Sequence, residues 1–129
     1  MIKQGILNPA VSSLLCRVRH TNTLVIADRG FPNWPSVETV DLSLVDDLPT
    51  VATVLAAVLP NFQISHAWMA EEFLAGNPPA ARIAVEKLLG GAALGFEPHN
   101  RFKERVPRAV GLIRTGDTTQ YANIILESA

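Results

Sequence analysis

The chain has 129 residues, with 11 Lys or Arg against 12 Asp or Glu, so its formal net charge is −1 when the three His are neutral. This length fits a single domain covering residues 1–129. A composition of 48% hydrophobic and 18% charged residues is typical of a globular protein and excludes a disordered one. Net charge near zero gives no global field for nucleic acid or anionic lipid, and no apolar run approaches the roughly 18 residues of a membrane span.

The single cysteine, Cys16, excludes an intramolecular disulfide and fits a reducing compartment. The first residues lack a basic region followed by an apolar stretch, so we expect no signal peptide and a cytoplasmic location. The low charge and positive mean hydropathy favour further burial of surface in an oligomer.

In chain order, the sequence alternates between helical and strand patterns. Asn8 and Pro9 are typical of a helix start, and the apolar spacing that follows predicts a helix ending near His20. Residues 23–27 are apolar and β-branched, as in a strand covered on both faces. Further helices are expected at 49–59, 79–89 and 99–105, and further strands at 37–44, 62–70, 93–97, 109–113 and 121–126. This order predicts an α/β domain, a three-layer sandwich with a mostly parallel, Rossmann-like central sheet.

His20 and Asp28 form the first candidate site. His20 is expected at a helix end and Asp28 at the carboxyl end of a buried strand, the edge where open α/β sheets bind ligands. A histidine changes charge near neutral pH and can act as an acid or a base. A helix cap and a turn former explain the two residues equally well.

Two further candidates lie near the C-terminus. His99 and Lys103 are four residues apart and share a face of the expected helix. Tyr121 and Asn123 are expected to project to one side of the last strand, where a phenol and a carboxamide suit sugar hydroxyls. Both pairs also admit a purely structural role.

Other chemistries have little support. Arg101, Lys103, Arg105 and Arg108 form a basic cluster, but Glu104 interrupts it, so a solvated helix face is favoured over nucleic-acid binding. Three His and one Cys show no metal-ligand spacing, and no nucleophile motif occurs. We therefore predict no metal and no cofactor.

Three sequence blocks together resemble the family of D-ribose pyranases and L-fucose mutarotases (RbsD/FucU-like). They are residues 5–9 (GILNP), residues 19–28 (RHTNTLVIAD) and residues 113–126, which contain IRTGD and YANIIL. The resemblance covers nearly the whole chain. His99 with Phe102 and Lys103 is similar to the ribose branch of the family.

The resemblance implies a mutarotase or pyranase that interconverts cyclic forms of a free monosaccharide, with ribose the first substrate to test. His20 and Asp28 would be catalytic; Asp28, His99, Tyr121 and Asn123 would contact the sugar, and Lys103 would complete the pocket of an adjacent subunit. The family further implies a homo-oligomer, a decamer of stacked pentamers with sites between subunits, and no nucleic-acid or membrane partner.

Two alternatives stay open. The chain has Arg19 and Asn22 where the family usually has Gly and Asp, which permits a non-catalytic sugar-binding or regulatory protein on the same scaffold. The second alternative is a mutarotase that acts on L-fucose rather than ribose.

Overall fold

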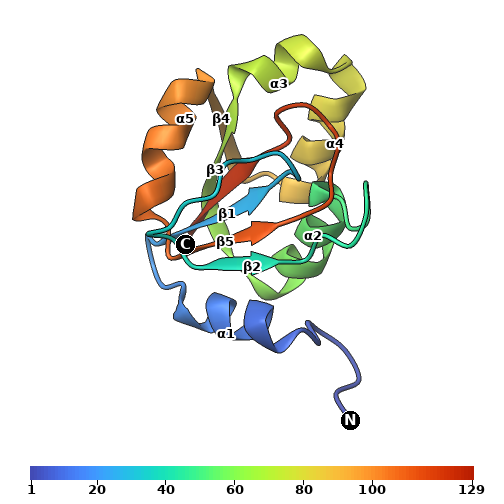
Figure 1. Cartoon of the computed structure of the whole chain (residues 1–129), viewed down its shortest axis with the longest axis vertical. Coiled ribbons are helices and arrows are strands. Elements are labelled where there is room, and N and C mark those ends of the chain that lie inside the picture. Colours follow the sequence, from blue (N-terminus) through green and yellow to red (C-terminus); the bar gives the residue numbers. More distant parts are fainter.

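The computed structural model describes all 129 residues, and its centre is one six-stranded sheet (Figure 1). The strands are β1 (Thr23–Ala27), β2 (Thr39–Asp41), β3 (Ile64–Ala70), β4 (Ala93–Glu97), β5 (Gly111–Arg114) and β6 (Ile124–Ser128). Their order across the sheet is β2-β5-β1-β6-β3-β4. Strand β6 runs antiparallel to both of its neighbours, whereas the other three pairings are parallel.

The reversed direction of β6 decides which segments meet at each edge of the sheet. The segment that precedes β6 lies at the same edge as the carboxyl ends of the parallel strands. The segment that precedes β1 lies at the opposite edge, where the Thr21 N–H donates to the Ser128 carbonyl at the end of β6 (3.0 Å). We call these two the carboxyl edge and the amino edge.

Five helices cover the two faces of the sheet. They are α1 (Pro9–Arg17), α2 (Val51–Val58), α3 (Glu71–Gly76), α4 (Pro79–Leu89) and α5 (His99–Arg105). Alternate β1 residues point to opposite faces, so Leu24 and Ile26 pack with α1, α2 and α4, while Val25 and Ala27 pack with Phe102 of α5. The first face holds 18 buried core residues and the second holds 8, so the core is thinner under α5.

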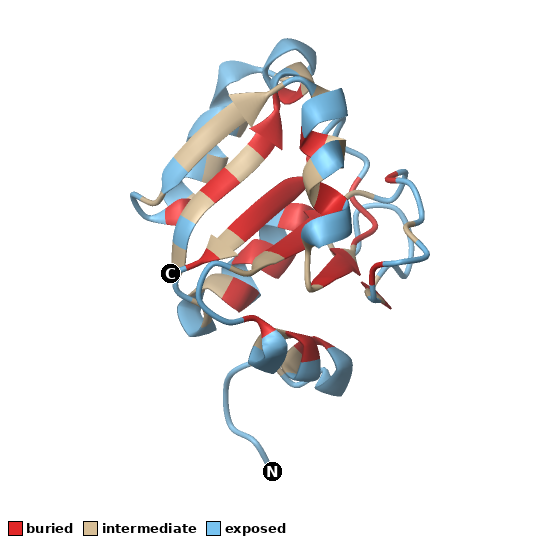
Figure 2. Ribbon diagram, turned by 90° about the vertical axis from the view of Figure 1, so that its left-hand side faces the viewer, coloured by how far each residue is buried: buried red, intermediate tan, exposed pale blue.

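The predicted fold class is confirmed: the chain is a three-layer α/β domain with a mostly parallel sheet. The buried residues concentrate in the central strands and on the inward faces of the helices (Figure 2). None of the helices has the length and apolar character that crossing a membrane demands.

Several elements differ from the prediction. Helix α1 ends at Arg17 rather than near His20, because Val18 is extended and residues 19–22 form a turn. Strand β2 covers only 39–41. The last strand begins at Ile124 rather than Tyr121, which has a φ of 56° and cannot continue a strand. Helix α3 was not predicted, because it follows β3 directly with no turn residue between them.

Candidate functional site at the carboxyl edge

A cavity of about 270 Å³ opens at the carboxyl edge of the sheet. Its walls come from three separate segments: the end of β1 with the loop that follows it, the start of α5, and the turn before β6. The lining residues are Asp28, Gly30, Phe31, Pro32, His99, Gln120, Tyr121 and Asn123. Four of the six residues predicted for the site, Asp28, His99, Tyr121 and Asn123, therefore come together in one cavity.

Asp28 and Asn123 hold each other in a reciprocal pair. The Asp28 backbone N–H donates to Asn123 Oδ1 (2.8 Å), and Asn123 Nδ2 donates to Asp28 Oδ2 (2.9 Å). The other carboxylate oxygen, Oδ1, accepts the Gly30 N–H (2.9 Å). Asn123 is only 2% exposed, so this pair is a rigid floor for the cavity.

Burial raises the pKa of Asp28 above its ordinary value. The hydrogen bonds from Gly30 and Asn123 oppose that shift, and the negative charge of Asp117 adds a little to it. Desolvation disfavours the ionised form of a carboxyl, which makes the carboxylate a stronger base when it is ionised. Asp28 is thus suited to accept a proton from a bound hydroxyl.

His99 begins α5, and its ring lies among aromatic groups. It stacks on Phe102 at 6.0 Å and meets Tyr121 and Phe31 edge-on, at 5.1 and 6.2 Å between ring centres. Its Nδ1 is buried with no hydrogen-bond partner. A proton on Nδ1 would lack an acceptor. The favoured form is therefore the neutral ring with its proton on the other nitrogen, Nε2.

The surroundings of His99 also lower its pKa. Burial is the main cause, the positive charge of Lys103 acts in the same direction, and the negative charges of Glu72 and Asp28 oppose it. A carboxyl with a raised pKa and an imidazole with a lowered one therefore share the cavity. Such a pair is a frequent arrangement for proton transfer near neutral pH.

Tyr121 reaches the cavity from a turn rather than from a strand. The expectation that Tyr121 and Asn123 project to one side of the last strand is wrong, because both precede β6 and the Tyr121 backbone is left-handed. The turn is held by the residue that follows α3, where Asn77 Nδ2 donates to the Gln120 carbonyl (2.9 Å). Tyr121 is 38% exposed and forms the outer wall of the cavity.

Arg114 fastens the loop on the other side of the cavity. From the end of β5 its guanidinium donates to the Phe31 carbonyl (2.7 Å) and the Pro32 carbonyl (3.3 Å). The loop that carries Gly30 and Phe31 is therefore tied to the sheet although it has no regular structure.

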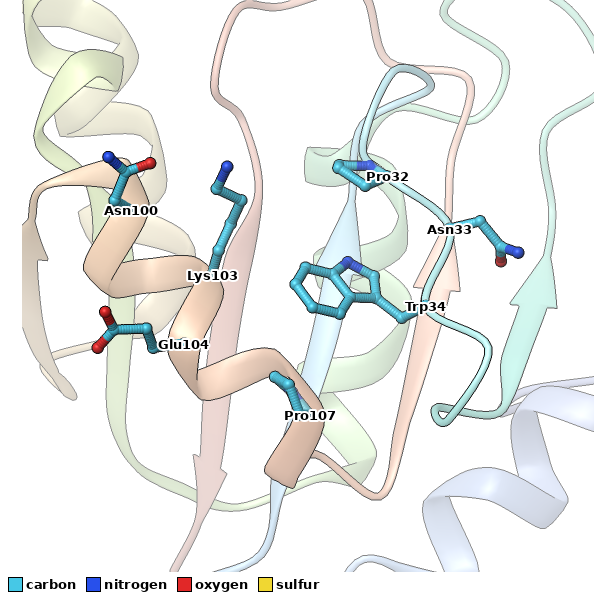
Figure 3. Close-up of a pocket in the computed structure, with 7 residues that line it drawn as sticks. All are labelled: Pro32, Asn33, Trp34, Asn100, Lys103, Glu104 and Pro107. Carbon is cyan, nitrogen blue, oxygen red and sulfur yellow. The ribbon is translucent and has the colours of Figure 1, made fainter.

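Lys103 does not line this cavity. It lies one turn beyond His99 on α5, in a neighbouring hollow of about 380 Å³ whose lining includes Trp34 and Pro107 (Figure 3). The two hollows share Pro32. The positive charge of Lys103 acts on His99 of its own chain. That Lys103 also completes the sugar pocket of an adjacent subunit stays a prediction.

His20 lies far from Asp28 within the chain. It is exposed in the turn before β1, at the amino edge, whereas Asp28 follows β1 at the carboxyl edge. The five-residue strand β1, about 16 Å long, lies between them. The expectation that a helix end places His20 beside Asp28 is wrong, because α1 ends three residues earlier and β1 carries the chain across the whole sheet.

Asn22, one of the two departures from the family pattern, has a local role. Its Oδ1 accepts the Arg19 N–H (3.0 Å), and its own N–H donates to the Arg19 carbonyl (2.8 Å). Aspartate would offer the same acceptor oxygen. The departure thus preserves the turn that presents His20.

The basic cluster is partly neutralised. Arg105 pairs with Glu97 and lies over the Trp68 ring at 4.3 Å, and Arg101 lies 3.9 Å from Glu104. His66, also outside the cavity, packs on Trp68 with 4.4 Å between ring centres. No group of three or more His, Cys, Asp or Glu side chains is close enough to hold a metal ion.

Sequence reasoning missed several residues of the site. Phe31 and Gln120 line the cavity, and Glu72 accepts the His99 backbone N–H. Phe31 lay in a segment interpreted only as a loop. The pair Glu71–Glu72, placed directly after the predicted strand 62–70, was the available signal, because acidic residues there reach the carboxyl edge.

Taken together, the fold and cavity define a small α/β protein with a polar site for a hydroxyl-bearing ligand at the sheet edge. The model of the RbsD / FucU transport protein family matches residues 1–129, and the chain belongs to this family.

Individual relatives agree. The chain is 41% identical over 128 residues to the D-ribose pyranase of Geobacillus kaustophilus, covering 99% of this chain and 93% of that protein. It is 43% identical to the D-ribose pyranase of Chromobacterium violaceum, covering 99% and 97%.

Solved structures extend the comparison. Bacillus subtilis RbsD complexed with D-ribose superimposes with a TM-score of 0.93 at 34% identity, covering 100% of this chain and 98% of that one. The fucose mutarotase of Streptococcus pneumoniae, in complex with L-fucose, gives a TM-score of 0.81 at 19% identity, covering 95% and 93%. The second likeness concerns the fold alone.

Proposed function

We propose that this protein is a sugar mutarotase of the D-ribose pyranase type. It interconverts cyclic forms of a free monosaccharide, pyranose with furanose or one anomer with the other, and ribose is the first candidate. The observation that carries the proposal is the cavity of Asp28, His99, Tyr121 and Asn123 in a chain 41% identical to a D-ribose pyranase. The same cavity accounts for monosaccharide binding.

The reaction requires two proton transfers and no redox step. Opening a cyclic hemiacetal removes a proton from the anomeric hydroxyl and delivers one to the ring oxygen, and closure reverses both. Asp28 accepts the hydroxyl proton, since burial makes it a stronger base. Neutral His99 and Tyr121 donate hydrogen bonds that orient the sugar, and the ring oxygen still needs an acid.

We assign that acid to His20 of a neighbouring subunit. Within one chain, His20 and Asp28 lie beyond opposite ends of β1, which is about 16 Å long, more than a monosaccharide spans. His20 is exposed at the amino edge, free to meet another copy's open cavity. Head-to-tail contacts of this kind form rings when the rotation between subunits closes, which is compatible with a homo-oligomer such as a decamer of stacked pentamers with sites between subunits.

Mixed oligomers test the shared site. His20→Ala and Asp28→Asn are each expected to lose exchange activity when purified alone. Refolded or co-expressed together at equal amounts, they should regain about a quarter of the wild-type rate, because about one site in four receives both intact groups. Two-dimensional exchange NMR of ribose measures the rate, corrected for the spontaneous reaction.

The assembly has its own measurement. Light scattering should report a species larger than a dimer, and a mass near that of the 14.0 kDa chain would contradict the shared site. If the oligomer forms but mixed samples stay inactive, both groups act within one subunit or not at all, and the assignment of His20 fails.

A sugar panel separates the catalytic from the non-catalytic function. Saturation-transfer NMR with ribose, fucose and related sugars should show exchange above background for ribose. Binding without exchange would instead mean a sugar-binding or regulatory protein, and preference for fucose an L-fucose-type mutarotase. A cytoplasmic location belongs to this proposal and is supported by the lone, unpaired Cys16.

A further inference from the structure

Glu72 contacts the first residue of α5 from a different element. The His99 backbone N–H donates to both carboxylate oxygens of Glu72, at 3.2 Å and 3.0 Å. Helix α5 starts after Pro98, whose side chain provides no cap, so its first N–H would otherwise lack a partner. A carboxylate at this position also complements the positive end of the helix dipole.

The contact joins two sides of the site. Glu72 lies in the first turn of α3, which continues directly from β3, and the same helix leads to Asn77, which holds the Tyr121 turn. Glu72 is half-buried but does not line the cavity. Its direct contact with the residues that line the cavity is the one to His99.

We propose that Glu72 is a positioning residue for the sugar site: it fixes the start of α5 so that the His99 ring faces the cavity, and its charge opposes that of Lys103 at His99. This inference rests on the proposed function for its catalytic consequence. The effect of Glu72 on the position and titration of His99 does not depend on the proposed function.

The charges around His99 come from every element that packs against it. Asp28 follows β1, Glu72 belongs to α3, Lys103 lies on α5 and the Tyr121 phenol comes from the turn before β6. Glu72 and Asp28 favour the imidazolium, and Lys103 with burial disfavours it. Removal of the Glu72 charge should therefore lower the pKa of His99, and removal of the Lys103 charge should raise it.

Three variants separate shape from charge. Glu72→Gln keeps an acceptor oxygen for the His99 N–H but loses the charge, whereas Glu72→Ala loses both. Glu71→Gln is the matched control, since Glu71 is the exposed neighbour on the same helix turn and makes no bond to α5. The assembled protein is used throughout, and circular dichroism confirms folding.

The decisive readout is the ring of His99, followed by NMR as a function of pH, beside the rate of ribose exchange. Glu72→Gln should titrate at lower pH than wild type with sugar affinity retained, and the acid limb of its pH–rate profile should move the same way. Adding Lys103→Ala to it should return the titration toward wild type. Glu72→Ala should lower kcat/KM roughly tenfold, the effect expected from the loss of about one charge-assisted hydrogen bond.

The proposal fails if Glu72→Gln and Glu71→Gln titrate alike, or if Glu72→Ala turns over at the wild-type rate. Should Glu72→Ala not fold, Glu72→Gln decides alone, because it preserves size and the acceptor. Absence of ribose exchange in wild type would overturn the proposed function instead, and the His99 titration would still test Glu72.

Discussion

The two edges of the sheet are built in different ways. At the carboxyl edge, the groups around Asp28 are tied together across long stretches of chain, as in the bond from residue 28 to residue 123. At the amino edge, the turn that carries His20 is held mainly by contacts within residues 19–22 and two bonds to Ser128. The carboxyl edge is therefore a rigid receptor, and the amino edge presents one exposed side chain.

The largest expected effect comes from removing the His20 side chain. His20→Ala should reduce ring-opening exchange by roughly 10² or more, as for loss of one acid/base group, while fold and assembly stay intact. Exchange NMR measures the rate, and thermal unfolding checks the fold. Arg19→Ala, an exposed neighbour in the same turn, is the control and should stay within a few-fold of wild type. A His20→Ala protein as fast as wild type would remove the amino edge from the chemistry.

At the carboxyl edge, Asn123→Ala should affect the stability of the protein as well as its activity. Asn123→Ala leaves the Asp28 N–H and a carboxylate oxygen without their partner, so unfolding should become easier by about 1–3 kcal/mol. Urea denaturation measures this loss. His20→Ala, made in the opposite turn, should lose far less, and equal losses would contradict the contrast between a rigid and a presenting edge.

Asp28 itself should make stability depend on pH. Its pKa is raised in the fold, so the folded state holds the proton more tightly than the unfolded chain does. Its stabilising contribution is thus complete below the unfolded pKa, near 3.9, and is lost as pH rises through the higher folded value. Asp28→Asn should consequently gain stability relative to wild type between acid and neutral pH. Urea midpoints at several pH values test the sign, and a gain that shrinks with rising pH would contradict it.

The smallest effects are expected at Asn22. Asn22→Asp keeps the acceptor for the Arg19 N–H and should change the exchange rate by less than about threefold. Asn22→Ala removes that acceptor and should lower the exchange rate about fivefold, as expected for the loss of one ordinary hydrogen bond. Parallel rate measurements on the two variants decide. If Asn22→Asp instead raised the rate strongly, a carboxylate at this position would have a chemical role beyond the turn.

Apolar patterns predicted the fold well, because the continuous apolar run of β1 and the helical spacing in α4 are local signals. Asp28 and Asn123 were singled out because polar residues beside apolar strands are conspicuous, and His99 because it lies four residues from Lys103; the structure places all three at one cavity. The expected closeness of His20 and Asp28 within one chain was wrong, since closeness in sequence says nothing of which strand end a residue occupies. The antiparallel direction of β6, which brings Asn123 to Asp28, depends on pairing between distant strands and leaves no local signal.

The position of His20 and Asp28 at opposite ends of β1 has a kinetic consequence. A lone subunit carries both groups but cannot bring them to the same sugar. When subunits are dilute, any rate that needs both groups grows faster than in proportion to the amount of protein, and it becomes proportional only once assembly is complete. Under the proposed assignment of His20, newly synthesised chains would contribute nothing until they meet, and the onset of activity in a cell would follow subunit concentration rather than folding.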